Sequence, residues 1–319
     1  MRINVKTADK IATFIFYLCA LCIMVLLAFF IGYILYKGSG RLNLSFLTSE
    51  PKFMKSGGGI GPQLFNSIYL VFLSMLITLP IGMSAGIYMA EYAKPNRFTK
   101  IVRFCIETLS SIPSIVIGLF GMLIFVNMTG WGFTLMSGAL AVSVLNIPIV
   151  TRISEDAIRG VPGSYKEASL GLGATHWQTI VKVIVPAAIP SLITGIILTA
   201  GRVFGEAAAL LYTAGMSSPQ LDFTNLNPFD SSSPLSPFRP AETLAVYIWK
   251  VNSEGLVPDA REIADGASAV LILSVLVFNL AARILGGFIN TRFAGSNGRR
   301  TGGFRRFFGS QFKKLGGAK

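Results

Sequence analysis

Long apolar runs separated by short polar segments dominate the hydrophobic pattern of this 319-residue chain. The first run, 11–36, contains no charged residue. About 20 apolar residues in a helix are enough to cross a hydrocarbon core about 30 Å thick. The pattern therefore predicts an all-α membrane protein with one bundle of six spans, at about 11–36, 64–90, 104–127, 133–150, 188–214 and 264–290.

The composition indicates the same class of protein. Hydrophobic residues make up 52% of the chain and charged residues only 13%, and the mean hydropathy is +0.61. A soluble globular domain carries about 25% charged residues. The composition therefore excludes an ordinary soluble domain.

The basic residues are distributed unevenly between the predicted spans. Of the 28 lysines and arginines, 19 fall in 1–10, 91–103, 151–187 and 291–319. Because short cytoplasmic segments are enriched in Lys and Arg, we expect a cytoplasmic N-terminus (1–10), a cytoplasmic loop (151–187) and a basic cytoplasmic tail (291–319). The net charge of +13 is thus interpreted as membrane topology, with no nucleic-acid partner expected. The basic residues of the tail, interleaved with phenylalanines, favour adhesion to anionic lipid, with single-stranded nucleic acid binding and disorder as the alternatives.

Two helix-start signals lie in the polar segment between the fourth and fifth predicted spans. Ser164 with Glu167, and Thr175 with Gln178, fit the S/T-x-x-E/Q capping box. Gly173, with Gly171 before it, is suited to end a first short helix. The pattern predicts a helix, a glycine turn and a second helix.

The second of these helices is amphipathic in the sequence. Pro186 is expected to limit it before the next span begins. Apolar residues with helical spacing form one stripe, at Trp177, Ile180, Val181 and Ile184. Such a segment either packs beneath its own bundle or docks onto a soluble partner, and the pattern alone leaves both interpretations open.

Arg202 and Glu206 are the unusual residues of the fifth predicted span. A charge at the centre of a membrane helix costs about 2.5–3.5 kcal/mol, so such residues usually pair or face a water-filled path. Their i, i+4 spacing places both on one helical face, where they can pair. In the structural interpretation the two residues form an ion pair beside a close-approach motif, Gly201-x-x-x-Gly205. In the functional interpretation they line an anion path, because a guanidinium suits a tetrahedral oxyanion.

Other residues of the spans fit structural roles. Glu91 and Glu107 lie near predicted cytoplasmic ends, where interfacial pairing is expected with Lys94, Arg97, Lys100 and Arg103. Proline is expected to kink or loosen the spans at Pro80, Pro113 and Pro148. The three cysteines fall inside spans, where free Cys acts as a small hydrophobe, at Cys19, Cys22 and Cys105.

The sequence contains no sign of catalytic machinery. There is no G-x-x-x-x-G-K-[ST] phosphate loop, and His176, the single histidine, has no nucleophile or metal cluster near it in the sequence. We therefore expect no catalytic residue, no metal site and no cofactor in this chain. His176 is expected to be an exposed or docking residue.

The polar segment resembles the EAA loop of ABC importer membrane subunits. The family pattern is E-A-A, three residues, G, nine residues and I-x-L-P, and here Glu167-Ala168-Ser169, Gly173 and Val183-x-Val185-Pro186 match its spacing. The resemblance implies that Glu167, Ala168, Ser169, Gly173 and Pro186 couple the chain to an ATPase. It also implies the six-helix type I ABC importer permease (MetI-like) fold with a cytoplasmic coupling loop.

Further stretches resemble the PstA-type permease of phosphate importers, among them 152–180 and GRVFGEAAALLYTAG at 201–215. This resemblance implies a subunit of the bacterial cytoplasmic membrane that forms half of a phosphate path containing Arg202 and Glu206. The implied partners are a PstC-type permease, a pair of PstB-type ATPases that bind ATP and Mg²⁺, and an external PstS-type phosphate-binding protein. A permease for another oxyanion, such as molybdate or sulfate, is the main alternative, and a secondary transporter or channel the more distant one.

Overall fold

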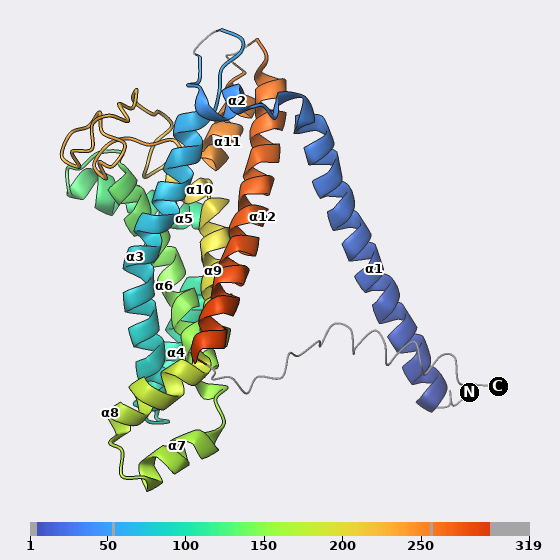
Figure 1. Cartoon of the computed structure of the whole chain (residues 1–319), viewed down its shortest axis with the longest axis vertical. Helices are drawn as coiled ribbons and strands as arrows, with labels where there is room; N and C mark the ends of the chain where they lie inside the picture. Colours follow the sequence, from blue (N-terminus) through green and yellow to red (C-terminus); the bar gives the residue numbers. More distant parts are fainter. Residues whose placement is uncertain (1–4, 53–54, 256–257, 294–319) are drawn as a thin grey trace.

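The computed structural model describes residues 5–52, 55–255 and 258–293, which form a bundle of long helices (Figure 1). In chain order its elements are α1 (Val5–Gly38), η1 (Ser39–Arg41), α2 (Leu44–Thr48), α3 (Gly61–Glu91), α4 (Arg97–Ser110), α5 (Ser114–Gly121), the π-helical η2 (Met122–Met128), α6 (Leu135–Arg159), α7 (Gly163–Gly171), α8 (His176–Thr179), the π-helical η3 (Ile180–Ile184), α9 (Val185–Phe204), α10 (Ala208–Leu211), α11 (Leu244–Glu254) and α12 (Ala260–Phe293).

The described helices include five that are long and apolar enough to cross a bilayer. By the same criterion α4 and the α5–η2 segment pass as a pair, bent by 94° at the break around Pro113, which gives up to six crossings. Pro80 and Pro148, in contrast, lie inside uninterrupted helices, α3 and α6. Of these three prolines, only Pro113 lies at a break. The predicted all-α six-span architecture is confirmed.

Two spans have bounds that differ from those predicted. The fourth, predicted at 133–150, continues to Arg159, so the first part of the predicted 151–187 loop is helix α6. The fifth, predicted at 188–214, is one helix over His176–Phe204 that ends because Gly205 interrupts it. Residues 294–319 of the predicted tail lie outside the described residues.

The seam between α3 and α6 brings the two backbones unusually close. A Cβ added at Gly82 would lie 2.8 Å from Val150 Cβ, and one added at Gly86 would lie 2.6 Å from the carbonyl oxygen of Thr151. These glycines form a small-xxx-small pair of the kind that lets membrane helices approach. The structural interpretation of the fifth span placed a close-approach motif at Gly201 and Gly205; a Cβ on Gly205 would meet no atom closer than 3.9 Å, so Gly205 makes no close approach.

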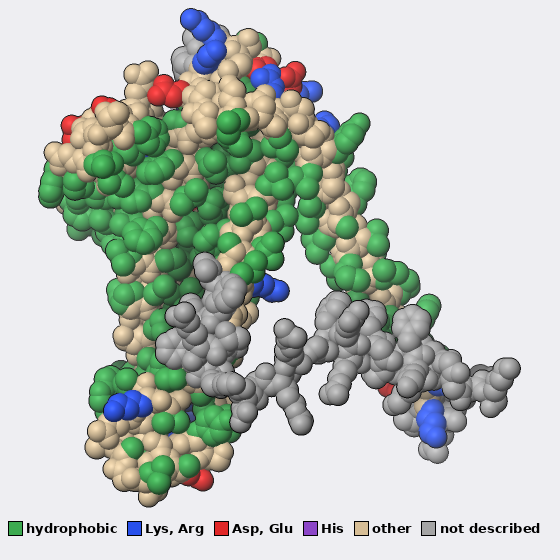
Figure 2. Space-filling view, viewed as in Figure 1, with side chains coloured by type: hydrophobic (Ala, Val, Ile, Leu, Met, Phe, Trp, Pro, Cys, Tyr) green, Lys and Arg blue, Asp and Glu red, His purple; other side chains and the backbone are tan. Residues whose placement is uncertain are grey.

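Helix α1 stands apart from the bundle over most of its length (Figure 1). It meets α12 near Gly38, which is buried against Asp265 and Ala269. Elsewhere its apolar side chains are largely exposed, as expected for a surface that contacts lipid or another membrane subunit. In Figure 2 hydrophobic side chains cover α1 and the middle of the bundle, while charged side chains gather toward the two ends.

The two ends of the bundle differ in construction (Figure 1). The loop end carries α2, α11 and the long loop 212–243. The α7–α8 end carries α7, α8 and the adjoining ends of α3, α4 and α6.

Candidate functional site

The α7–α8 unit consists of α7, the turn 172–175 and α8. Glu167 and Ala168 are exposed on α7, which has no buried residue. Ser169 faces α8, where its hydroxyl lies 2.9 Å from that of Thr179. Gly173 has a φ of +85°, a conformation that L-residues with side chains rarely adopt. The predicted helix, glycine turn and second helix are therefore present.

One of the two predicted capping boxes forms. Thr175 and Gln178 cap the start of α8 reciprocally. The box predicted at Ser164 is wrong, because α7 already begins at Gly163 and Pro162 occupies the N-cap position. Ser164 is therefore a helical residue, and its side chain is not placed to act as the cap.

The second amphipathic helix runs straight into the next span. Helices α8, η3 and α9 are continuous, and Pro186 lies in the first turn of α9 rather than at a helix end. The π-helical turn η3 precedes it and adjusts the backbone where proline lacks an N–H. The predicted stripe also divides: Ile180 and Ile184 are buried, whereas Trp177 and Val181 are exposed.

The turn of the α7–α8 unit exposes large apolar side chains, here called its apolar tip: Leu172 at the end of α7 is 90% exposed and Trp177 at the start of α8 is 63% exposed. Exposed aromatic and aliphatic side chains grouped on a polar element are typical of a protein interaction surface. The tip is thus a candidate docking surface.

Glu91, the last residue of α3, joins the span to this unit. Its Oε2 atom accepts hydrogen bonds from Lys166 Nζ at 2.6 Å and lies 3.3 Å from His176 Nε2. The ring of His176 also meets Tyr92 edge to face at 5.1 Å. Interfacial pairing of Glu91 is confirmed, but its partners come from the α7–α8 unit instead of its sequence neighbours.

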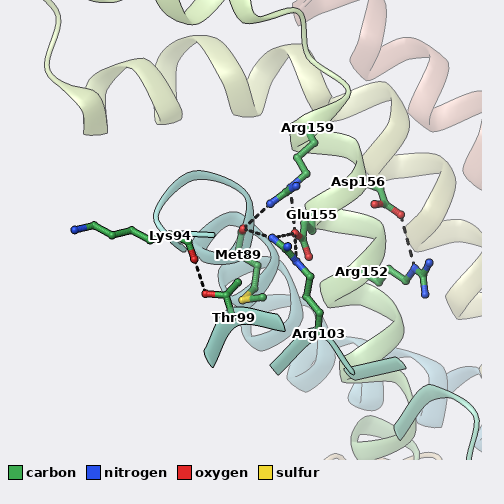
Figure 3. A network of polar contacts seen from close by, with 8 residues as sticks. All are labelled: Met89, Lys94, Thr99, Arg103, Arg152, Glu155, Asp156 and Arg159. Carbon is green, nitrogen blue, oxygen red and sulfur yellow. Dashed lines mark hydrogen bonds and ion pairs between the residues drawn. The ribbon is translucent and has the colours of Figure 1, made fainter. Parts of the chain in front are cut away.

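A second cluster, the Glu155 cluster, ties three helices together (Figure 3). Oε1 of Glu155 is 2.8 Å from Arg103 Nη2 and 3.1 Å from Arg159 Nε. Both guanidinium groups also donate to the carbonyl oxygen of Met89. Because Met89 is on α3, Arg103 on α4 and the other two on α6, the cluster fixes these helix ends relative to one another.

The sequence analysis missed the Glu155 cluster. The i, i+4 pair of Glu155 and Arg159 is a readable helix signal, but it was hidden because 151–187 was interpreted as a loop. Glu107, expected to pair with basic neighbours on its own segment, instead pairs with Arg152 of α6 at 3.0 Å, with both side chains more than half exposed.

The broken spans meet inside the bundle. Helix α5 packs against α10, which follows the break that ends α9; Gly118 lies close to the backbone of Ala208 and Ala209. At the other break, before Pro113, the hydroxyls of Ser110 and Ser111 donate to the carbonyl oxygen of Glu107. Non-helical backbone at membrane depth occurs where protein covers it or where it lines a water-filled cavity.

Arg202 and Glu206 lie on either side of the α9 break. Arg202 is exposed in the last turn of α9. Glu206 is buried, and its carboxylate accepts a hydrogen bond from the Ala209 N–H at the start of α10, at 3.3 Å. The expectation that they share one helical face and pair is wrong, because the helix ends between them. Within the described part of the chain Arg202 has no ion-pair partner.

At the loop end, a fully buried arginine organises the long loop. Arg239 donates through Nη2 to Asn66 Oδ1 at 2.7 Å and to the carbonyl oxygen of Pro234 at 3.0 Å. Desolvation lowers the pKa of Arg239 to about 10. No carboxylate pairs with it among the described residues.

A buried carboxylate lies nearby. Glu242 accepts from Gln63 Nε2 and pairs with Lys250, both at 3.1 Å. Desolvation raises the pKa of Glu242 despite the nearby Lys250. The segment 244–249 forms the first part of α11 and buries Leu244 and Tyr247.

The comparisons with known proteins agree with this architecture. Residues 82–295 match the family described as binding-protein-dependent transport system inner membrane component. The chain is 57% identical over 286 residues to the probable ABC transporter permease protein YqgI of Bacillus subtilis, covering 90% of this chain and 97% of that one. It is 31% identical over 283 residues to the phosphate transport system permease protein PstA of Haemophilus influenzae, covering 88% and 94%.

Two solved structures share the fold at low sequence identity. A structure of the MetNI methionine ABC transporter matches with a TM-score of 0.55 and 17% identity, covering 72% of this chain and 95% of that chain. A bacterial alginate ABC transporter, in complex with an alginate-bound periplasmic protein, matches with a TM-score of 0.57 and 16% identity, covering 89% and 98%.

Proposed function

We propose that this chain is a membrane subunit of an ATP-driven importer of inorganic phosphate. It belongs to the family of binding-protein-dependent transport system inner membrane components and is an ABC transporter permease of the PstA type. The relatives are permease subunits and not enzymes. The chain therefore forms part of the conduit, and ATP with Mg²⁺ is bound and hydrolysed by a partner.

The observation that carries this proposal is the α7–α8 unit at the end of an apolar bundle. The unit has the EAA spacing, a helix without buried residues and an apolar tip headed by Leu172. In this proposal Glu167, Ala168, Ser169 and Gly173 shape the part that sits on a PstB-type ATPase. Pro186 lies where this part continues into α9.

Arg202 and Glu206 are proposed to line the phosphate path. Arg202 presents a permanently charged guanidinium at the end of a membrane helix, with no ion-pair partner among the described residues, which suits an oxyanion. Glu206 holds the start of α10 at the break beside it. The two side chains thus have different tasks: Arg202 contacts the anion, and Glu206 positions the interrupted backbone.

The proposed assembly pairs this chain with a PstC-type permease, two PstB-type ATPases and an external PstS-type phosphate-binding protein. Both termini and the α7–α8 end face the cytoplasm in this arrangement, in agreement with the distribution of Lys and Arg. The loop end then faces outward, toward the binding protein. The exposed apolar surface of α1 contacts lipid or the second permease.

The test is uptake of radiolabelled phosphate by proteoliposomes that contain the complete complex, with sulfate and molybdate as competitors. Arg202→Leu is expected to lower uptake by at least about tenfold while the complex still assembles. Arg283→Leu, the same substitution in α12, is the matched control. Normal phosphate uptake in Arg202→Leu would remove Arg202 from the path.

A second oxyanion remains the competing substrate. The printed name of the 57% identical relative specifies a permease but no substrate. Uptake of labelled molybdate or sulfate that excess phosphate does not inhibit would assign the chain to that alternative.

A further inference from the structure

We propose that Glu91 is the polar link through which movement of the α7–α8 unit reaches α3. The inference rests on the proposed coupling of this unit to an ATPase, and it assigns a positioning role to a residue outside the EAA pattern. Glu91 ends α3, and one carboxylate oxygen meets Lys166 of α7 and His176 of α8. Three elements therefore converge on a single atom.

The α7–α8 unit is well connected internally. The hydroxyls of Ser169 and Thr179 lie 2.9 Å apart and join α7 to α8, and the capping box of Thr175 and Gln178 fixes the turn. Among the described residues, Glu91 is the single α3 residue that forms an ion pair or hydrogen bond with α7 or α8. Its side chain is 10% exposed, so water screens these pairs only in part.

Movement of the unit has two covalent routes into the bundle, because α7 follows α6 through residues 160–162 and α8 continues through η3 into α9. A third route is polar and passes through Glu91 into α3, which packs against α6 at the close seam of Gly82 and Gly86 and at the Glu155 cluster next to it. Without Glu91, a displacement of α7 would still move α6 and α9, while its direct polar connection to α3 would be lost.

The first experiment measures ATP hydrolysis and phosphate uptake in the same proteoliposomes. Glu91→Gln retains the shape of the side chain and removes its charge. We expect uptake to fall about tenfold while ATP hydrolysis changes less than about twofold, so that more ATP is used per phosphate. The matched control is Glu107→Gln, at the exposed ion pair with Arg152 that touches neither α7 nor α8; both rates should stay near those of the parent. An unchanged ratio of ATP to phosphate in Glu91→Gln would overturn the proposal.

Charge reversal separates a specific link from general damage. Glu91→Lys and Lys166→Glu should each uncouple the complex, and combining them should restore the ratio to within about threefold of the parent. Single variants that assemble and uncouple, followed by a double variant that does not recover, would contradict a direct Glu91–Lys166 link.

A distance measurement keeps this test independent of the transported anion. Spin labels at Ser164→Cys on α7 and Ile81→Cys on α3, in a background with the three native cysteines replaced by serine, report the separation of the two elements with and without ATP. We expect a narrow distribution in the parent and a broader one in Glu91→Gln. Equal widths would overturn the Glu91 proposal, whereas failure of phosphate uptake in the unsubstituted complex would count against the proposed substrate alone.

Discussion

The loop end and the α7–α8 end both join helices through charged side chains, but they bury them to different degrees. At the loop end Arg239 is fully buried and Glu242 is 2% exposed. At the α7–α8 end the carboxylates are nearly buried, but their partners are not: Lys166 is 36% exposed and Arg159 48%.

This difference predicts different mechanical behaviour. A buried polar group that loses its partner costs free energy because no water replaces the bond. The loop end therefore resists opening. A half-exposed ion pair contributes little, about 0–1 kcal/mol, and water solvates both partners when it separates. The α7–α8 end can thus rearrange at a lower cost in free energy than the loop end.

The largest expected effect concerns the seam between α3 and α6. Gly86→Val should lower the melting temperature of the purified chain strongly, because its side chain would collide with the α6 backbone at Thr151; overpacking of this kind costs about 1–3 kcal/mol or more. Gly32→Val is the control, since a Cβ at Gly32 of α1 would have no atom within 4 Å. Thermal unfolding in detergent compares them, and similar melting temperatures would contradict a close seam.

The next prediction compares the stability lost when a buried arginine is replaced with the stability lost when a half-exposed arginine is replaced. Arg239→Met removes the donors to Asn66 and to the loop carbonyl of Pro234, and acceptors left buried cost about 1–3 kcal/mol each. Arg159→Met at the other end should cost less than about 1 kcal/mol. Thermal unfolding in detergent measures both variants. A lower melting temperature for Arg159→Met than for Arg239→Met would contradict the difference drawn between the two ends.

A smaller effect on melting, with a larger one on transport, is expected at the glycine turn. Gly173→Val places a β-branched residue at a φ of +85°, a local strain of about 1–3 kcal/mol. The distorted turn should reduce binding of the ATPase subunit and uptake while the spans remain folded. Gly171→Val, in the helix next to it and with open space around its Cβ position, is the control. Copurification of the ATPase together with the uptake rate provides the measurement, and an unaltered Gly173→Val complex would argue against docking through this turn.

The smallest effect is the pH dependence of the loop end. Because burial raises the pKa of Glu242, its contribution to stability is fully present below its ordinary pKa of 4.5 and is lost as pH rises through the folded-state value. Glu242→Gln cannot ionise, so the melting temperature of this variant relative to the parent should increase as pH rises from 4 toward 8, by a few degrees at most. A difference independent of pH would show that Glu242 does not titrate in this way.

Much of the architecture follows from short-range patterns. The apolar runs predict the spans because crossing lipid requires a minimum length of apolar helix. The Thr175–Gln178 box and the turn at Gly173 were predictable because each involves residues within a few positions of one another. The EAA spacing is equally local, and so the sequence alone predicted the α7–α8 unit, while its kind of partner is what the family resemblance implies.

The tertiary structure decided the features that join distant segments. It selected Gly82 and Gly86 for the seam, buried Arg239 in the long loop, and brought Glu91 to Lys166. It also ended α9 before Glu206 and so separated a pair that helical spacing would have joined. These outcomes depend on which helices lie side by side and on where backbone groups find partners, and local periodicity contains neither piece of information.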